Sequence, residues 1–427
     1  MNSQNILQQI NAEAKFIENS IGYQKTKIGT IPKDWKVKKL KDISNRVQRK
    51  NDGKSHNVLT ISSKGGFLNQ TERFSKVIAG ENLAKYILLR KNEFAYNKGN
   101  SKTYPYGCIY RLEDYEEALV PNVYYCFEIR EGVTEFYKHY FITGKLNKFL
   151  ARVINTGVRN DGLLNLNVTD FFDVPVAAPP IKEQQKIASI LSTWDKAIEL
   201  KEKLIEQKIQ QKKGLMQKLL TGEVRLPGFE GEWGKFKIKE VCNVVSGGTP
   251  STNDKKNWDG NIPWCTPTDI TSSGKFIRNT KQTITEKGLK NSSANLLPKN
   301  SILMCSRATI GPRSINRVEM ATNQGFKSFV CNEEYLDYEF FYYLLSIYIP
   351  IFKKLASGST FLEVSKKDVE NTKIFIPKDV KEQKAIGSII GNLDKAIELL
   401  EEETKELKQQ KKGLMQLLLT GKVRVKV

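Results

Sequence analysis

The sequence has very little histidine and lacks the short motifs that many nucleotide-using enzymes carry. Only His56 and His139 occur among 427 residues, which leaves little material for histidine-based acid–base or metal chemistry. No Gly-x-x-x-x-Gly-Lys-Ser/Thr loop is present to hold a nucleoside triphosphate. Neither Asn-Pro-Pro-Tyr nor Asp-Pro-Pro-Tyr occurs, and no glycine fingerprint indicates a methyl donor. We therefore predict no catalytic residues, no metal site and no cofactor on this chain.

Long apolar runs and paired cysteines are also missing. The most apolar stretch, 340–352, contains Pro350 and is shorter than the about 20 residues of a membrane span, so we interpret it as a buried helix. The polar, amphipathic stretch 1–20 predicts no signal peptide. The six cysteines are isolated, which is typical of reduced core residues. These absences predict a cytoplasmic protein that does not enter a membrane.

Positive charge is abundant instead. Lys and Arg total 68 against 47 Asp and Glu, which gives a formal net charge of +21. A protein this basic is expected to bind a polyanion. The excess is spread along the chain and forms no polybasic amphipathic segment, which argues against a membrane surface. Composition therefore favours nucleic acid as the partner.

The most informative feature is a duplicated segment. Residues 182–226 align without a gap on residues 381–425, and 27 of 45 positions are identical. Asp195-Lys196-Ala197-Ile198-Glu199-Leu200, for example, returns as Asp394-Lys395-Ala396-Ile397-Glu398-Leu399. A repeat at this long interval indicates a duplicated unit made of a domain and a spacer.

Apolar residues in both copies follow alternating steps of four and three, the spacing of a heptad helix. Prolines precede each copy and a glycine follows it, so each predicts one helix of about 38 residues, roughly 57 Å long. Such helices need a partner, and the other copy is the nearest candidate; alternatively each lies on its own domain. The predicted seam consists of Ile187, Leu191, Trp194, Ile198, Ile205, Ile386, Ile390, Leu393, Ile397, Leu400 and Leu407.

The remaining sequence divides around these helices. We predict an N-terminal amphipathic segment (1–27), a first domain (28–178), a central spacer helix (179–227), a second domain (228–376) and a C-terminal spacer helix (377–427). Short β-type runs punctuated by Gly, Pro and Asn predict a mixed sheet in each domain, with one helix near 135–153 or 337–355. The fold class is therefore α/β (α+β), with two similar domains and two long helices.

Several motifs resemble the target-recognition domains of type I restriction-modification specificity subunits. Those in the second domain are Ser246-Gly247-Gly248-Thr249-Pro250, the run from Asn257 to Trp264, Thr309-Ile310-Gly311 and Thr322-Asn323-Gln324-Gly325. The opening Gly29-Thr30-Ile31-Pro32-Lys33-Asp34-Trp35 and the Lys-Glu-Gln start of both helices are similar to the same family. The first domain departs from the Gly-Gly-Thr-Pro signature, with Asn45-Arg46-Val47-Gln48-Arg49-Lys50 instead.

This resemblance implies a non-catalytic subunit that reads double-stranded DNA. Each domain would recognise one half of a bipartite, asymmetric site, and the helices, paired as an antiparallel coiled coil, would set the spacing. Leu204, Leu220 and Leu417 would dock two adenine-N6 methyltransferase subunits, to which restriction/translocase subunits would add. S-adenosylmethionine and ATP would bind only to those partners.

Contacts with DNA can be nominated from residue type. Lys and Arg suit phosphates, whereas Arg, Lys, Asn and Gln suit base edges. The candidates are Arg46, Gln48, Arg49, Lys50, Lys98, Asn100, Lys102 and Tyr104 in the first domain, and Thr249, Ser251, Lys255, Lys256, Lys275, Arg278 and Arg307 in the second. Each could equally be a solvated surface residue.

Some alternatives stay open at this point. Trp258 and Trp264 could stack on bases or anchor loops, and Gly247 and Gly248 could admit a phosphate or form a tight turn. A different function, a coiled-coil scaffold with two protein-binding globular ends, would explain the repeat but not the charge. Salt-sensitive binding to DNA would distinguish the two.

Overall fold

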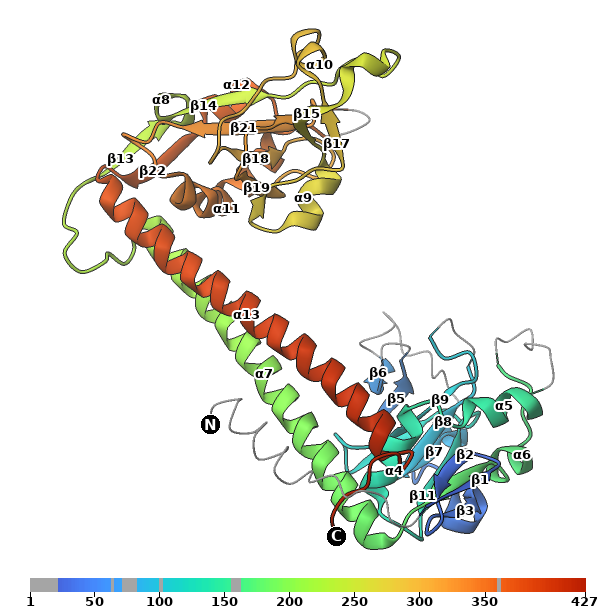
Figure 1. Ribbon diagram of the computed structural model, residues 1–427. Helices are drawn as coiled ribbons and strands as arrows, with labels where there is room; N and C mark the ends of the chain where they lie inside the picture. Colours follow the sequence, from blue (N-terminus) through green and yellow to red (C-terminus); the bar gives the residue numbers. More distant parts are fainter. Residues whose placement is uncertain (1–21, 63–64, 71–82, 100–102, 155–162, 359–361) are drawn as a thin grey trace. The chain divides into compact units, whose positions relative to one another are not determined.

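The chain forms two compact units in a computed structural model that describes residues 22–62, 65–70, 83–99, 103–154, 163–358 and 362–427 (Figure 1). The first unit comprises residues 1–201 and 403–427, and the second comprises residues 202–402. Most of the predicted N-terminal segment 1–27 lies outside the described residues. Its described end forms β1 (Tyr23–Thr26), which pairs with β2 (Gly29–Pro32) in the first unit.

The first domain is built from short strands that form several small sheets. Beyond the β1–β2 hairpin, its strands are β3 (Lys36–Lys39), β4 (Ser44–Val47), β5 (Asn57–Ile61), β6 (Phe67–Asn69), β7 (Ile87–Arg90), β8 (Phe94–Asn97), β9 (Cys108–Arg111), β10 (Glu117–Val120), β11 (Tyr125–Ile129) and β12 (Pro175–Ala178). One sheet has the order β6-β5-β10-β7 and is mixed, because β10 runs parallel to β5 and antiparallel to β7. The other, β4-β11-β8-β9, is antiparallel.

A separate two-stranded sheet forms the base of this domain, the part from which the chain continues into the first long helix. β12 pairs antiparallel with β3, with Val176 opposite Lys38, and the short helix α2 (Leu40–Ile43) follows β3 directly. The domain also contains η1 (Leu83–Lys85), α4 (Thr134–Ile142), α5 (Asn147–Val153) and α6 (Val168–Phe172). Aromatic rings from β8, β11 and α4 fill the core, where Phe94 stacks on Phe127 at 5.3 Å and both meet Phe141 edge-on.

The second domain repeats the plan of the first. β13 (Trp233–Lys237), α8 (Ile238–Val241) and β14 (Cys242–Ser246) follow one another as β3, α2 and β4 do. The remaining strands are β15 (Trp258–Cys265), β16 (Phe276–Ile277), β17 (Gln282–Ile284), β18 (Ile302–Cys305), β19 (Arg313–Asn316), β20 (Ala321–Thr322), β21 (Phe326–Cys331) and β22 (Lys373–Pro377). The helical elements are η2 (Lys255–Asn257), α9 (Pro267–Ser273), α10 (Glu286–Lys290), α11 (Tyr338–Leu355) and α12 (Lys366–Asn371).

Its sheets correspond to those of the first domain. The main sheet has the order β14-β21-β18-β19-β16, a smaller one has the order β17-β15-β20, and β13 pairs with β22 at the base. The main sheet contains one parallel pair, β16 with β19, and the smaller sheet contains another, β15 with β20. The predicted fold class of two mixed-sheet domains is therefore confirmed.

The helix predicted near 135–153 differs from its counterpart in the second domain. α11 runs unbroken from Tyr338 to Leu355, whereas the first domain has two helices, α4 and α5. The break falls at Gly144, whose φ of +69° is a left-handed conformation that ends a helix and that glycine adopts without strain.

The two long helices match their predicted positions. α7 (Ile181–Thr221) and α13 (Val380–Leu418) contain 41 and 39 residues. Pro180 and Pro377 precede them, and Gly222 and Gly421, with φ of +74° and +67°, follow them. The glycines relieve the steric cost of the left-handed turn that ends each helix.

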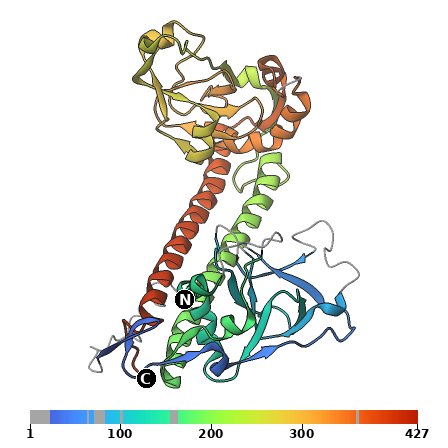
Figure 2. The same ribbon diagram turned by 90° about the vertical axis from the view of Figure 1, so that its right-hand side faces the viewer.

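The long helices pack against each other within each unit, and the two pairings run antiparallel. In the first unit the end of α13 lies beside the first half of α7, in both views (Figures 1 and 2). In the second unit the end of α7 packs with the start of α13. The predicted antiparallel helix pair is thus confirmed.

No helix within the described ranges is both long and apolar enough to cross a membrane. All six cysteines are free thiols, four of them buried and two half-buried.

Candidate nucleic-acid interface

A buried ion-pair anchor ties the start of α7 to the end of the chain in the first unit. The Glu183 carboxylate is almost fully buried and accepts hydrogen bonds from Trp35 Nε1 at 2.8 Å and from Arg424 Nε at 2.7 Å. Arg424 Nη2 also donates to Asp34 at 2.6 Å. Because a buried carboxylate is costly unless it is paired, this contact fixes the helix pair to the base of the domain.

The second unit contains the same anchor at the repeated positions. Glu382 is buried and accepts from Arg225 Nε at 2.7 Å and Nη2 at 2.8 Å, and from Trp233 Nε1 at 3.4 Å. The residues that follow one long helix therefore hold the start of the other helix and the first strand of the domain. Sequence alone singled out these glutamates only within the Lys-Glu-Gln motif and did not single out the arginines, although the repeat contains both pairs.

A second set of ion pairs crosses the helix seam. Lys411 binds Asp195 in the first unit, and Lys212 binds Asp394 in the second, again at repeated positions. His139 lies 3.7 Å from Asp195, while Tyr343 donates to Asp394 at 2.6 Å. Burial lowers the pKa of His139 to about 4, so the ring is neutral at pH 7.

The seam residues differ in burial along the helices. Ile187, Leu191, Trp194, Ile198 and Leu407 belong to the core of the first unit, and Ile386 and Ile390 to that of the second. Ile397 is buried as well, whereas Ile205, Leu393 and Leu400 are half-buried. The exposed fraction of Leu220 is 1%, so the prediction that it docks a partner is wrong; Leu204 and Leu417 are each 39% exposed.

In the second domain the motifs that suggested the family pack onto one another. The Gly248 N–H donates to the Thr322 carbonyl oxygen at 2.9 Å, and the Thr249 hydroxyl donates to the Gln324 side chain. A Cβ on Gly247 would lie 2.0 Å from the Asn323 carbonyl oxygen. A Cβ on Gly248 would lie 2.3 Å from the carbonyl carbon of Ser293. Neither glycine has a left-handed φ, so close packing against these neighbouring segments, rather than a tight turn, requires Gly247 and Gly248.

The tryptophans near these motifs serve as anchors. Trp264 is buried and its Nε1 donates to the Gly248 carbonyl oxygen at 2.9 Å. Trp258 packs edge-on against it at 5.0 Å and donates to the Ser251 carbonyl oxygen at 3.1 Å. Both indole nitrogens are therefore used within the protein, and the loop that follows Gly248 is held in place by them.

The nominated residues of the first domain fall into different environments. Arg46, within β4, and Gln48 and Lys50, which follow that strand, are exposed. Arg49 points inward, where its two terminal nitrogens donate to Glu93 at 3.2 and 3.1 Å, an ion pair that raises the pKa of the guanidinium. Lys98 lies 5.2 Å over the Tyr125 ring, and Tyr104 shares a 2.7 Å hydrogen bond with Tyr110. Asn100 and Lys102 lie outside the described residues.

Among the candidates of the second domain, most are exposed. These are Thr249, Ser251, Lys255, Lys256, Arg278 and Arg307. Lys275 is different, because its ammonium group donates to Glu339 at 2.9 Å and lies 4.7 Å from the centre of the Tyr343 ring. Lys275 directly precedes β16, so its contacts link α11 to the edge strand of the main sheet.

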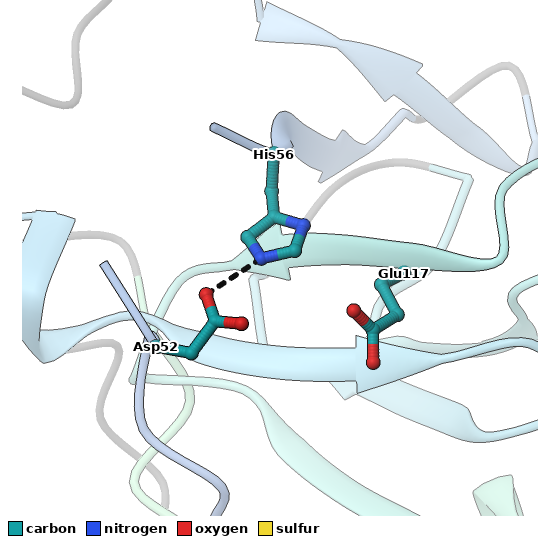
Figure 3. Close-up of side chains that lie close together, drawn as sticks. All are labelled: Asp52, His56 and Glu117. Atoms are coloured by element: carbon teal, nitrogen blue, oxygen red, sulfur yellow. Dashed lines mark hydrogen bonds and ion pairs between the residues drawn. The ribbon is translucent and has the colours of Figure 1, made fainter. Parts of the chain in front are cut away.

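Asp52, His56 and Glu117 form a cluster of potential metal ligands in the first domain (Figure 3). Their ligand atoms lie within 4.8 Å of one another, and His56 Nε2 is 2.7 Å from Asp52 Oδ1. The Lys54 N–H and His56 lower the pKa of Asp52 to about 2. Glu117 accepts from Arg90 Nε at 3.0 Å and Asp52 lies 3.4 Å from Lys54 Nζ, so both carboxylates have cationic partners. We assign the cluster to anchoring the loop before β5.

The duplication, the mixed-sheet domains and the repeated anchors together define a class of protein. Its members have two related domains, each attached to an antiparallel pairing of the same two long helices. Residues 32–211 and 230–409 match the family described as type I restriction modification DNA specificity domain. The chain therefore belongs to that family, and both of its halves carry the family domain.

Similar proteins cover either nearly the whole chain or about half of it. A putative type I restriction enzyme MjaX specificity subunit from Methanocaldococcus jannaschii is 28% identical over 95% of this chain and 97% of its own length. The EcoprrI specificity subunit of Escherichia coli is 32% identical over 42% of this chain and 46% of its own. A type I restriction-modification S subunit from M. genitalium has the same fold, with a TM-score of 0.56, 16% identity and coverage of 94% and 97%.

Proposed function

We propose that this chain is the DNA sequence-specificity subunit of a type I restriction-modification complex, and that each domain reads one half of a bipartite, asymmetric site. The observation that carries the proposal is the pair of matching anchors, Glu183 with Arg424 and Glu382 with Arg225, which hold two diverged domains in equivalent ways. Two domains that read different half-sites need different surfaces toward DNA but the same attachment to the helices. The net charge of +21 supports a polyanionic ligand.

The helix pair would act as the spacer between the half-sites. A helix of 41 residues, the length of α7, is roughly 60 Å long, which corresponds to at most about 18 base pairs of duplex. Because the two helices would lie antiparallel along one rod, the rod would become longer only when both helices are lengthened. Spacer length would then follow from helix length and not from either domain.

Exposed leucines on the helices would dock two methyltransferase subunits. Leu200 and Leu399 occupy the same repeat position, and their exposed fractions are 56% and 52%. Leu204 and Leu417, each 39% exposed, would extend these surfaces. Two equivalent apolar surfaces suit two copies of one partner. Restriction/translocase subunits would join this assembly, and S-adenosylmethionine and ATP would bind to the partners.

The test is adenine methylation across the host genome, measured with and without the gene for this chain. We expect a split motif to lose methylation completely when the chain is absent, and expression of the chain to restore it. Exchanging residues 22–178 for the corresponding domain of a relative should change one half-site and leave the other intact. Unaltered methylation after deletion would refute the proposal.

The competing function, a scaffold with two protein-binding ends, predicts a different salt dependence. An electrostatic interface that neutralises several phosphates weakens steeply with salt, with a log–log slope of about −0.9 per phosphate contact. We therefore expect the affinity of the complex for a duplex carrying the split motif to fall by several orders of magnitude between low and moderate salt. The absence of duplex binding by the assembled complex would favour the scaffold.

A further inference from the structure

Two free cysteines of the second domain lie opposite each other on neighbouring strands. Cys242 is the first residue of β14 and Cys331 is the last residue of β21, and the antiparallel register of these strands pairs the two directly. They are 89 positions apart in the sequence, so only the fold brings them together. Side chains at opposite positions of an antiparallel pair project from the same face of the sheet, so the two thiols lie on one side of it.

The hydrogen bonds beside this pair determine how close the two backbones are. Val241 and Asn332 flank the cysteines, and the Asn332 N–H donates to the Val241 carbonyl oxygen at 3.0 Å. This bond makes Cys242 and Cys331 a non-hydrogen-bonded pair of the ladder. The Cα atoms of such pairs are about 4.5 Å apart, within the range of about 4.4 to 6.8 Å found across disulfides. A bond between the two sulfur atoms therefore needs little movement of the backbone.

The two thiols interact in the reduced protein. Cys242 is 4% exposed and belongs to the core of the second unit, whereas Cys331 is half-buried and packs against that core. A hydrogen bond with the Cys242 thiol, together with burial, raises the pKa of Cys331 well above its usual value. Since the thiolate is the reactive form, the pair should stay reduced at neutral pH until a strong oxidant is present.

The first domain has the same backbone geometry but lacks the cysteines. β4 and β11 correspond to β14 and β21, and their equivalent residues, Ser44 and Ile129, pair in the same register. The Arg130 N–H donates to the Ile43 carbonyl oxygen at 2.9 Å, as in the bond beside Cys242. Any cross-link of this kind is therefore confined to the second domain.

We propose that Cys242 and Cys331 form a redox-sensitive site that closes to an intramolecular disulfide when the protein meets a peroxide. The thiolate of Cys331, the less buried of the two, attacks one oxygen of hydrogen peroxide and becomes a sulfenic acid. The other oxygen leaves as hydroxide and takes up the proton that Cys331 has lost. The sulfur of Cys242 then attacks the sulfenic sulfur, and its proton leaves with the sulfenic hydroxyl as water. The two thiols are oxidised by two electrons, and one peroxide is reduced to two waters.

The bond would join the two strands at the end of the ladder that is remote from the family motifs. At the other end, four positions along, Ser246 pairs with Lys327, next to the motifs that begin at Ser246 and end at Gly325. The loop that the bond closes, 242–331, contains β15 to β20. The cross-link therefore ties the base of the main sheet and leaves the residues around the motifs in place.

The experiment exposes the folded, full-length chain to an excess of hydrogen peroxide at mildly alkaline pH. Remaining thiols are then alkylated in denaturant and counted by intact mass. We expect the number of alkylated thiols in wild type to fall from six to four, and trypsin to release peptides 240–255 and 328–353 joined to each other. Dithiothreitol should separate the two peptides and restore all six thiols.

Three variants test whether these two positions are responsible. Cys242→Ser and Cys331→Ser should each release the same two peptides unlinked. The matched control is Cys108→Ser, because Cys108 is half-buried like Cys331 but lies opposite Asn97. This control should lose two thiols on treatment, as wild type does. Should Cys242→Ser fail to fold in a thermal melt, Cys331→Ser decides, because it replaces the less buried residue.

Peroxide treatment in denaturant measures how far the fold selects the pair. The six thiols of the unfolded chain can pair in many ways, so we expect several linkages there and a single linkage in the folded protein. Six alkylated thiols after treatment of the folded chain, a linkage between any other two cysteines, or a sulfinic acid at Cys331 in place of the link would each overturn the proposal.

Discussion

Lengthening both long helices by one heptad should widen the gap between the two half-sites without altering either of them. The change duplicates residues 201–207 in α7 and residues 399–405 in α13. These segments lie opposite one another, because Lys201 pairs with Glu403, and a seven-residue insertion keeps the apolar seam in phase. Every native residue is retained, including the exposed leucines proposed to dock a partner.

The magnitude follows from helix geometry. Seven residues at about 1.5 Å each lengthen the rod by roughly 10 Å, and at about 3.4 Å per base pair this corresponds to a gap wider by up to 3 base pairs. Both anchors lie far from the insertion in sequence, so the attachment of each domain should be unchanged. Genome-wide adenine methylation measures the result directly.

A matched control inserts the heptad in α7 alone. One helix then has residues without a partner, and the ion pairs Lys411–Asp195 and Lys212–Asp394 cannot both form. We expect a lower melting temperature and little methylation from this variant. A double insertion that left the gap unchanged, or that changed the bases of either half-site, would refute the spacer role.

Other predictions concern stability. Leu407→Asp buries a charge in the seam and should lower the free energy of unfolding by about 3 to 5 kcal/mol, whereas Leu417→Asp, at a 39% exposed position, should leave the melting temperature nearly unchanged. Gly247→Ala should lower the free energy of unfolding, measured by denaturant titration, by about 2 kcal/mol or more, because its Cβ would lie 2.0 Å from a carbonyl oxygen. Gly214→Ala should raise the free energy of unfolding by about 1 kcal/mol, because the residue lies within α7 and its Cβ would have nothing within 4 Å. His139 has a pKa near 4 in the folded state and about 6.5 in the unfolded state, so the unfolded state takes up the proton first as pH falls. The free energy of unfolding of the first unit should therefore fall by roughly 3 kcal/mol between pH 6.5 and pH 4. A His139→Gln variant whose free energy of unfolding depended on pH as steeply as that of wild type would contradict this.

The parts of the fold that depend on local periodicity could be predicted from sequence. Steps of three and four predicted one long helix of about 38 residues in each copy of the repeat, where α7 and α13 lie, because a long amphipathic helix is specified by its own sequence. Sheet connectivity could not be predicted, since β12 pairs with β3 from more than a hundred residues away. The break between α4 and α5 had a visible signal in Gly144, but a single glycine also occurs within α7, at Gly214, without breaking that helix.

Side-chain partners limited the prediction of the site. Arg49 and Lys275 have the composition of a DNA contact, yet Glu93 and Glu339, which bind them, lie 44 and 64 residues away. The anchors show the same limit, because Glu183 and Arg225 recur within the repeat, but only the antiparallel packing pairs each glutamate with the arginine of the other copy. Residue type therefore predicts what a side chain can bind, and the tertiary fold decides what it does bind.

The exchange of anchor partners between the repeats has a consequence for a shortened protein. Residues 22–227 contain one domain, one long helix, and both an acidic and a basic anchor residue, Glu183 and Arg225. Two copies of this fragment could close both anchors reciprocally, each arginine binding the glutamate of the other copy. Such a homodimer would have true two-fold symmetry, and the site it reads would be an inverted repeat of a single half-site.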